Sequence, residues 1–273
     1  NVFEGIRCYW SSQRNNLYAF RLDDHLNRLL RSLKLFRFEN RYSFDYLKEC
    51  FTKVIRANNY KEDIAVRQTI FLDGFGSWFA EGPINMFISP IPKARIDPYL
   101  PNGIKCCVSS WERINDNSLS PRVKVGANYI NSRVAQLEAL HNNYNSAIFL
   151  NNQGKVSEGP GSCIFIVRNN KLITPLLTAS VLESITRDTV IEIAKNELGL
   201  TVEERDIDRT ELYIADEVFL CGSAIEISSV VDIDGYVIGK GEKGKITKEL
   251  HHMYLEIVSA KVNKYLKWLT AIY

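Results

Sequence analysis

The sequence lacks the features that mark several common classes of protein. Its 273 residues contain no apolar run long enough to span a bilayer, no internal repeat and no low-complexity segment. There is no tract of basic residues, and the formal net charge is only +2, so neither nucleic acid nor a membrane surface is an expected partner. The four histidines show no metal-ligand spacing, so no metal site is expected.

Cysteine patterns typical of disulfide frameworks or redox motifs are also missing. The six cysteines are scattered, none belongs to a C-x-x-C pair, and most lie in apolar runs where a reduced, buried thiol is the usual state. We therefore expect a reducing compartment, the cytoplasm. The N-terminus lacks the charged-then-apolar pattern of a signal peptide. Because the chain begins directly in an expected strand, we expect further residues before Asn1 in the full protein.

The composition is that of an ordinary globular protein, and the prolines are clustered in one segment. Apolar residues make up 45% of the chain and charged residues 24%, and the length suits one or two domains. Four of the eight prolines lie in one short stretch that ends at Asn102-Gly103. This predicts a stiff interdomain linker at residues 93–103, between a small domain at 1–92 and a larger domain at 104–273.

Hydrophobic periodicity predicts the secondary structure of the small domain. Alternation of apolar and polar residues indicates strands at 2–10, 16–21, 64–73 and 84–89. Two amphipathic helices are expected between them, one from Leu22 and one that Ser43 caps. Strands and helices in blocks, rather than in strict alternation, indicate an α+β domain.

The larger domain combines the same two patterns. Strands are expected at 104–111, 146–150, 163–168, 201–205, 217–221, 227–233 and 236–238. Helices are expected at about 128–141, at about 187–198 and in a final segment from Ile246. In the first of these helices the apolar residues are expected to face the core: Ile130, Val134, Leu137 and Leu140.

Two segments of the larger domain carry residues with catalytic potential. Lys124 lies just before a small-residue turn, with a helix opening behind it, where an amine that forms a Schiff base can be held. A surface lysine in a loop is the commoner meaning of such spacing. Glu158 ends a strand before the Gly159-Pro160-Gly161 bend, a pattern that also fits a solvated acid in a hairpin.

Two further segments have the geometry of anion sites. Thr186 is expected to cap the helix that follows, which would leave backbone N–H groups at the helix N-terminus for a phosphate. The turn Gly222-Ser223-Ala224 ends a strand and offers a hydroxyl with consecutive amides. Taken singly, the first segment is better explained by an ordinary N-cap, and the second can be a plain turn between strands.

Taken together, these segments resemble the branched-chain amino acid aminotransferases, pyridoxal-phosphate enzymes of fold type IV. In the family's order, the matching blocks are FEGIRCY (3–9), KVGANYINS (124–132), SEGPGS with IF (157–165), ITRD (185–188), ADEVFLCGSAIEI (215–227) and IDGYVIGKGEKGKITK (233–248). The resemblance covers nearly the whole chain and is strongest from residue 120 to 250. It implies an α+β fold with a small α/β N-terminal domain and a larger C-terminal domain built on a mixed, barrel-like sheet.

The resemblance implies a role for each matching residue. Lys124 would bind the cofactor aldehyde and move a proton between the substrate Cα and the cofactor C4′. Glu158 would pair with the pyridine nitrogen, and Tyr129 would lie near the phenolic oxygen of pyridoxal 5′-phosphate. The other cofactor-binding residues would be Arg28, Ile185, Thr186 and Ser223 at the phosphate and Leu182 on the ring. The substrate-binding residues would be Phe3, Gly5, Arg67, Ala224 and Ile225.

Several positions depart from the family's pattern. The strand that carries Arg67 reads Ala65-Val66-Arg67-Gln68 where the family commonly has Tyr-x-Arg-Pro, Ser184 replaces a glycine, and Ile225 replaces a second alanine. Ser223 stands where the family usually has threonine and keeps the hydroxyl. The cofactor end of the expected site is therefore complete, whereas the substrate end differs from the family.

The implied activity is transamination between L-leucine, L-isoleucine or L-valine and 2-oxoglutarate. The alternatives on the same fold are a D-amino acid transaminase, an amine transaminase and an enzyme resembling aminodeoxychorismate lyase. A catalytically silent homologue that binds pyridoxal phosphate is a further alternative, although retention of both Lys124 and Glu158 argues against it. The resemblance also implies a homodimer or an assembly of dimers.

Overall fold

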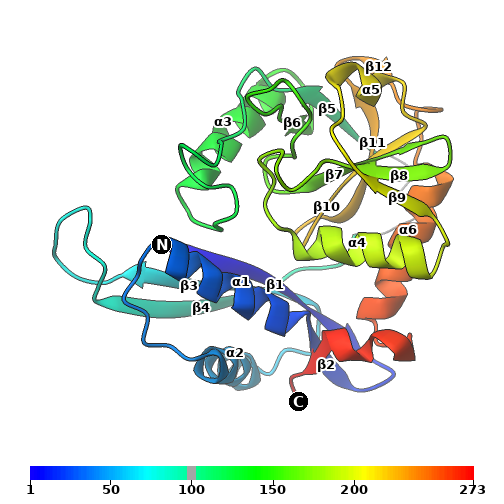
Figure 1. Cartoon of the computed structure of the whole chain (residues 1–273). Coiled ribbons are helices and arrows are strands. Elements are labelled where there is room, and N and C mark those ends of the chain that lie inside the picture. The colour runs from blue at the N-terminus through cyan, green and yellow to red at the C-terminus, as the bar shows by residue number, and fades with distance from the viewer. Residues whose placement is uncertain (97–102) are drawn as a thin grey trace. The chain divides into compact units, whose positions relative to one another are not determined.

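The structure is a computed structural model, and it describes residues 1–96 and 103–273. The chain divides into two compact units, coloured by residue number in Figure 1. The first unit contains residues 1–95, 123–126 and 255–273, and the second contains residues 96–122 and 127–254. The predicted linker falls mostly on residues 97–102, which lie outside the described residues, and the predicted domain limits stay a prediction.

The first unit is built on a five-stranded antiparallel sheet with the strand order β13-β2-β1-β3-β4. Its strands are β1 (Val2–Ser11), β2 (Asn16–Phe20), β3 (Ile64–Leu72), β4 (Ile84–Pro92) and β13 (Leu269–Ala271). Pro90 and Pro92, which belong to the proline-rich stretch, lie within β4. An edge strand tolerates proline because the missing N–H faces away from the ladder.

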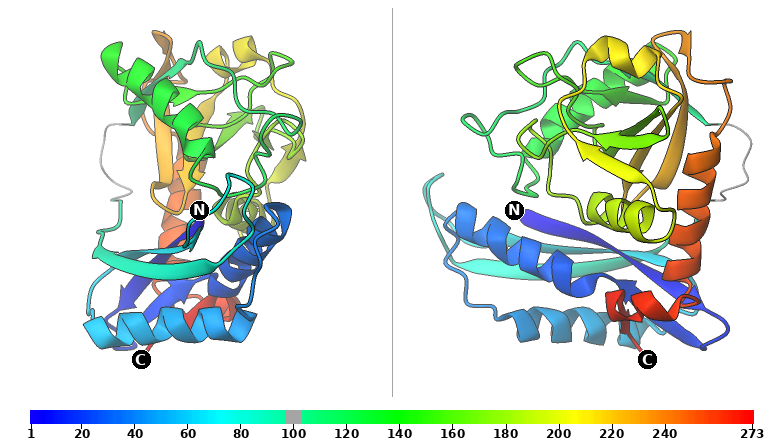
Figure 2. Two further views of the ribbon diagram at one scale, coloured as in Figure 1. Left: turned by 90° about the vertical axis from the view of Figure 1, so that its left-hand side faces the viewer. Right: turned by 45° about the vertical axis from the view of Figure 1, so that its right-hand side comes forward.

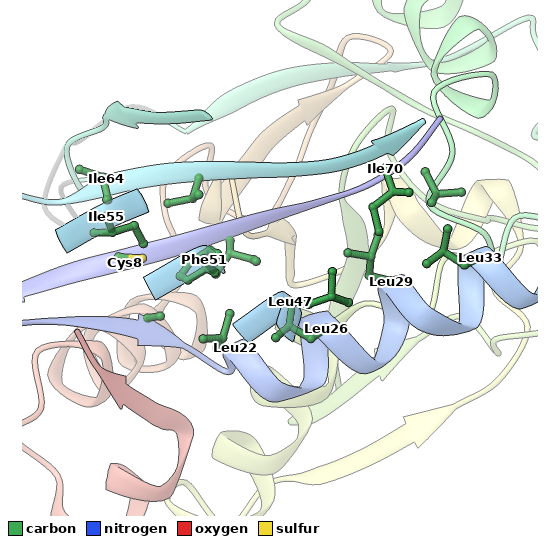
Figure 3. Close-up of a cluster of buried hydrophobic side chains, with 14 of the residues drawn as sticks. Cys8, Leu22, Leu26, Leu29, Leu33, Leu47, Phe51, Ile55, Ile64 and Ile70 are labelled. Carbon is green, nitrogen blue, oxygen red and sulfur yellow. The ribbon is translucent and has the colours of Figure 1, made fainter. Parts of the chain in front are cut away.

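Two helices form the core of this unit with one face of the sheet. Helix α1 (Leu22–Leu35) and helix α2 (Phe44–Asn58) bury leucine and phenylalanine side chains against β1 and β3 (Figure 3). As predicted, Ser43 caps α2, and its hydroxyl accepts a hydrogen bond from the Tyr46 N–H at 3.2 Å. Because side chains alternate along a strand, Ile6 and Cys8 of β1 join this core while Phe3 and Gly5 lie on the opposite face.

The second unit contains an eight-stranded mixed sheet with the order β6-β5-β11-β10-β7-β8-β9, and β12 pairs with β11. Its strands are β5 (Ile104–Val108), β6 (Ser146–Ile148), β7 (Cys163–Arg168), β8 (Lys171–Thr174), β9 (Thr201–Glu204), β10 (Glu217–Gly222), β11 (Glu226–Ile233) and β12 (Tyr236–Val237). The mixed character was predicted. Among the described residues, the end strands β6 and β9 do not pair with one another, so the strand path is open.

Four α-helices accompany this sheet: α3 (Asn128–His141), α4 (Ile185–Asn196), α5 (Arg209–Tyr213) and α6 (Lys245–Val258). Helix α4 contacts β9 and β10, and the right-hand view of Figure 2 shows this yellow-green helix beside the yellow strand β9. The short 3-10 helix η1 (Asn263–Trp268) belongs to the first unit. Within residues 1–96 and 103–273, no helix is both long and apolar enough to cross a membrane.

The structure corrects the predicted core face of α3. Ile130, Leu137 and Leu140 are 64%, 38% and 53% exposed instead of buried. The helix packs through small residues, since Ala135 and Ala139 are fully buried in a cluster with neighbouring residues of β5 and β6. Alanine lets the helix backbone come close to the sheet, and periodicity alone does not distinguish this small-residue face from the larger apolar one.

Candidate active site

In the first unit, three of the predicted site residues meet on the face of the sheet opposite the helices. The Arg67 guanidinium carbon lies 3.9 Å from the centroid of the Phe3 ring, and the Lys124 Nζ lies 4.9 Å from the same centroid. Gly5 is the register partner of Arg67 across β1 and β3. Cations over an aromatic face are attracted by its quadrupole, so Phe3 provides a common platform for both basic side chains.

The backbone around Lys124 is anchored within this unit. The Phe3 N–H donates to the Lys124 carbonyl at 3.0 Å, and Val125 forms a bridge with Val2. The Lys124 N–H donates to the Ser32 hydroxyl at 3.4 Å. A short segment held by β1 and α1 therefore presents a half-buried lysine, and its role as the Schiff-base residue stays a prediction.

A buried charged cluster lies on the helix-facing side of β1. The Arg28 guanidinium donates to both oxygens of Glu4, with Nε 2.7 Å from Oε1 and Nη2 2.8 Å from Oε2. The His25 Nδ1 lies 2.7 Å from Glu4 Oε2. Burial raises the pKa of the Glu4 carboxyl, but the charge and hydrogen bonds of Arg28 and His25 outweigh burial and hold that pKa well below its usual range.

This cluster bears on the role predicted for Arg28. Its guanidinium is engaged with Glu4 in the described structure, and its assignment to a phosphate stays a prediction. Sequence reasoning did not single out Glu4 or His25. The available signal was an acid at a core-facing position of a strand that is otherwise apolar on that face, because such a charge requires buried partners.

In the second unit, Glu158 is buried, with only 4% of its surface exposed. Its Oε1 accepts a hydrogen bond from the Arg113 Nε at 2.8 Å, and the Arg113 Nη2 lies 2.8 Å from the same oxygen. Its Oε2 accepts from the Leu182 N–H at 3.2 Å and lies 3.9 Å from the Cys163 thiol. The alternative of a solvated hairpin acid is therefore wrong.

Arg113 is a site residue that the sequence analysis missed. Besides Glu158, it reaches helix α3, because its Nη1 donates to the Asn131 Oδ1 at 3.1 Å. Tyr129, which is half-buried, lies two residues earlier on that helix. Arg113 thus connects the segment that carries Glu158 to the first turn of α3. No local pattern in the sequence marks it, since its partners are 45 and 18 residues away.

The N-terminus of α4 corrects one prediction. Ser184, not Thr186, is the N-cap, and its hydroxyl accepts from the Arg187 N–H at 3.2 Å. The helix therefore begins at Ile185, earlier than a cap at Thr186 would allow. Ile185 and Thr186 lie in the first turn, where backbone N–H groups have no acceptor within the helix. Such a terminus still suits a phosphate, because both amides and the helix dipole favour an anion.

The turn between β10 and β11 lies next to the Gly-Pro-Gly bend. Cys163 and Cys221 are register partners in the antiparallel pair of β7 and β10, so Gly161 and Ser162, just before Cys163, lie beside Gly222, just after Cys221. A side chain on Gly222 would come 3.2 Å from the Gly161 carbonyl, so this close approach favours glycine. The turn is closed by the Ile225 N–H, which donates to the Gly222 carbonyl at 3.1 Å. Ser223, Ala224 and Ile225 are partly or fully exposed.

Each unit therefore carries a distinct part of the predicted chemistry. The first holds an amine and a guanidinium over Phe3. The second holds a buried carboxylate, a helix N-terminus and a turn that carries the Ser223 hydroxyl. No cluster of three or more histidine, cysteine, aspartate or glutamate side chains suited to a metal ion occurs among the described residues.

Comparisons with known proteins agree with this set of groups. A family model described as amino-transferase class IV matches residues 1–233. The chain is 41% identical over 280 residues to an Aquifex aeolicus (strain VF5) protein named "Probable branched-chain-amino-acid aminotransferase", and the match covers 100% of this chain and 88% of that protein.

Solved structures give the same result. The chain is similar to the branched-chain amino acid aminotransferase from Thermobaculum terrenum in its PLP-form, with a TM-score of 0.95, 43% identity and coverage of 100% of this chain and 89% of that one. It is also similar to the branched-chain aminotransferase from the thermophilic archaeon Thermoproteus uzoniensis with norvaline. That match has a TM-score of 0.93, 41% identity and coverage of 100% of this chain and 90% of that one.

Proposed function

This chain belongs to the class IV aminotransferase family, and from that premise we propose that it transfers the amino group of L-leucine, L-isoleucine or L-valine to 2-oxoglutarate with pyridoxal 5′-phosphate as cofactor. The observation that carries the proposal is the buried Glu158 carboxylate, held by Arg113 and the Leu182 amide. A carboxylate fixed in this way is the group that a protonated pyridine nitrogen requires.

The donor set of the chain fits this cofactor. The helix α4 N-terminus offers amides of Ile185 and Thr186 for a phosphate dianion, and Ser223 offers a hydroxyl. Arg28 would add a guanidinium, and Leu182 would pack on the ring. When bound, pyridoxal phosphate supplies an electrophilic carbon for the amino group and a ring that withdraws electrons from the substrate Cα.

Lys124 would provide the amine that binds the cofactor and the base that moves the proton at the substrate Cα. Both roles need a side chain that returns to one position after each step, and the hydrogen bonds of its backbone to Phe3 and Ser32 support this. Glu158 would hold a proton on the ring nitrogen. The charge of Arg113 favours the ionised form of Glu158 that this task requires. Tyr129 would donate its O–H to the phenolic oxygen.

Substrate recognition would divide between the two carboxylates. The Ala224 and Ile225 amides would receive the α-carboxylate, and Arg67 would receive the side-chain carboxylate of glutamate, the product of the second half-reaction. The Arg67 guanidinium lies over the Phe3 ring, and its Nε donates to the Thr69 hydroxyl at 3.2 Å, so two contacts restrict its position. Gly5 lies opposite Arg67 in the ladder and leaves β1 without a side chain at that position.

A panel of amine donors tests the substrate. Purified enzyme is incubated with pyridoxal phosphate, 2-oxoglutarate and one donor, and glutamate formation is measured. We expect leucine, isoleucine or valine to give a higher kcat/KM than D-alanine or an aromatic amine. The opposite ranking would contradict the proposed substrate. A protein that does not bind pyridoxal phosphate at all would contradict the cofactor as well.

One residue favours a second candidate. Ala65, opposite Arg7 in the ladder of β1 and β3, leaves more space than the tyrosine that the family commonly has there. A wider pocket suits D-amino acid or amine transamination on the same fold. The donor panel distinguishes these activities, since they would reverse the ranking above.

We also propose a homodimer in the cytoplasm. The exposed side chains Ile130, Leu137 and Leu140 give α3 an apolar outer face, and Phe75, Trp78 and Phe79 are strongly exposed between β3 and β4. Each of these two exposed apolar groups, taken by itself, would favour burial against a second chain. The compartment is supported by the cysteines, because all six are free thiols and five of them are buried.

A further inference from the structure

A buried ionic cluster lies directly behind the turn formed by Ser223, Ala224 and Ile225. Its members are Glu226, Lys243 and His251, with exposed fractions of 0%, 7% and 0%. They come from three places in the second unit, namely the first residue of β11, the loop before α6, and α6 itself. None of them belongs to the residues assigned above to cofactor or substrate.

Within the cluster, His251 faces Lys243 with one ring nitrogen and Glu226 with the other. The Lys243 Nζ lies 2.9 Å from the His251 Nδ1. An ammonium can only donate, so a charged Lys243 would pair with the tautomer in which Nδ1 accepts and Nε2 carries the proton. The His251 Nε2 lies 3.8 Å from the Glu226 Oε2, too far for a hydrogen bond but close enough for electrostatic attraction. The same Oε2 accepts a hydrogen bond from the Ile96 N–H at 2.8 Å.

The backbone of Glu226 explains why a side chain is needed there. Its φ is +51°, a left-handed conformation that non-glycine residues rarely adopt and that persists only when the surroundings fix it. Glycine would adopt this φ without strain, so the glutamate is present for its side chain. That side chain is buried, whereas Ser223 and Ala224 are partly or fully exposed and Ile225 packs against the core of the unit.

The charge of Glu226 also bears on the turn. A carboxylate one residue beyond a turn that binds anions would weaken binding unless its charge were compensated. Lys243 provides the compensating charge, and the His251 ring contacts Lys243 through Nδ1 and faces Glu226 through Nε2. Breaking a buried pair from one side leaves an isolated charge, whereas removing both charges does not.

We propose that Glu226, compensated by Lys243 through His251, is a positioning residue that fixes the Ser223-Ala224-Ile225 turn for the cofactor phosphate and the substrate carboxylate. The inference rests on the proposed function. Glu226 itself touches neither ligand, since it is fully buried. Its effect is on the geometry and the electrostatic potential of the turn.

The test compares four variants of the full chain: E226Q, K243M, the double variant E226Q/K243M, and E217Q as a matched control. Glu217 also holds α6, because its two carboxylate oxygens accept the Ile246 and Thr247 N–H groups, but it begins β10 and lies at the end opposite the turn. The readouts are the dissociation constants of pyridoxal phosphate and inorganic phosphate from the apoprotein, measured by fluorescence, together with KM, kcat and the thermal midpoint.

We expect E226Q to raise the dissociation constants and the KM for the amino acid by about five- to tenfold, with a smaller change in kcat. K243M should raise the dissociation constants and KM further than E226Q does, and the double variant should recover part of that lost affinity. E217Q should lower the thermal midpoint without changing KM. Constants for E226Q within about twofold of the wild type would contradict the inference, as would a double variant no better than K243M. If the wild type itself did not bind pyridoxal phosphate, the proposed function would fail instead, so the two failures are distinct.

Discussion

Arg113 and Glu158 form a buried pair in which two nitrogens of the guanidinium, Nε and Nη2, each lie 2.8 Å from the same carboxylate oxygen. The second oxygen of Glu158 accepts the Leu182 N–H. This arrangement fixes the direction of the carboxylate, and the charge of Arg113 favours its ionised form, as the proposed pairing with a protonated ring nitrogen would require. Under the proposed function, the cofactor chemistry would therefore depend on a residue outside the recognised motifs.

The first prediction concerns this pair. Arg113→Met would leave Glu158 buried without its counter-charge, and a carboxylate in that position takes up a proton. We expect a loss of about 100-fold in kcat/KM and of about 3–5 kcal/mol in the free energy of unfolding. Steady-state kinetics and urea titrations measure the two effects.

Arg122→Met serves as the control for Arg113. Arg122 pairs with Glu183 at 3.2 Å, but both side chains are about one-third exposed or more, so this pair should contribute less than about 1 kcal/mol. Equal effects of the two substitutions would contradict the role assigned to Arg113.

The second prediction concerns the amine. Lys124→Ala removes the proposed nucleophile and base, and we expect the visible absorption band of the bound cofactor to disappear and kcat to fall by at least about 1,000-fold. Residual binding of pyridoxal phosphate through groups of the second unit should remain detectable by equilibrium dialysis. A variant that kept the band would show that another amine holds the cofactor.

The third prediction concerns acid stability and the cluster of Glu4 and His25. The pKa of Glu4 is lowered from 4.5 in the folded protein, and burial also lowers the pKa of His25 from 6.5. In both cases the unfolded chain binds the proton more readily, so stability must fall as pH decreases. The loss should begin below about pH 6.5 through His25 and deepen below about pH 4.5 through Glu4.

Urea unfolding at a series of pH values measures this dependence. His25→Gln should remove the upper part of the decline while leaving the lower part. An unchanged profile for this variant would assign the decline to other groups.

The fourth prediction concerns assembly. Leu140→Glu places a charge on the exposed apolar face of α3, and we expect sedimentation to shift from dimer to monomer with little change in the thermal midpoint of the monomer. Leu176→Glu, at another partly exposed leucine of the second unit, should leave sedimentation unchanged. If both variants sediment as the wild type does, α3 does not carry the interface.

Local features of the fold follow directly from the sequence. Period-two alternation locates β1 and β3 within a few residues, and the sequence alone identifies Ser43 as a helix cap, which its hydrogen bond confirms. The cap of α4 is predicted at Thr186, although Ser184 holds it. Two hydroxyl residues stand two positions apart, and the choice between them depends on where the preceding chain arrives.

For Lys124, the local sequence predicts the chemical role, and long-range contacts determine the position of the side chain. Its motif marks it as the expected nucleophile, whereas the bridge of its neighbour Val125 to Val2 and the position of its amine over Phe3 appear only in the tertiary structure. Local sequence supplies the reactive group, and long-range packing fixes it in place.

The sequence by itself determined the order of the motifs, the family and the residue types available for cofactor chemistry, because these depend on short-range sterics, hydrogen bonding and residue identity. Only the tertiary structure decided which side chains are buried together. It paired Arg113 with Glu158 and Glu4 with Arg28, and it turned the larger apolar face of α3 outward. Burial is a property of the surface that a segment meets, and no single segment contains that information.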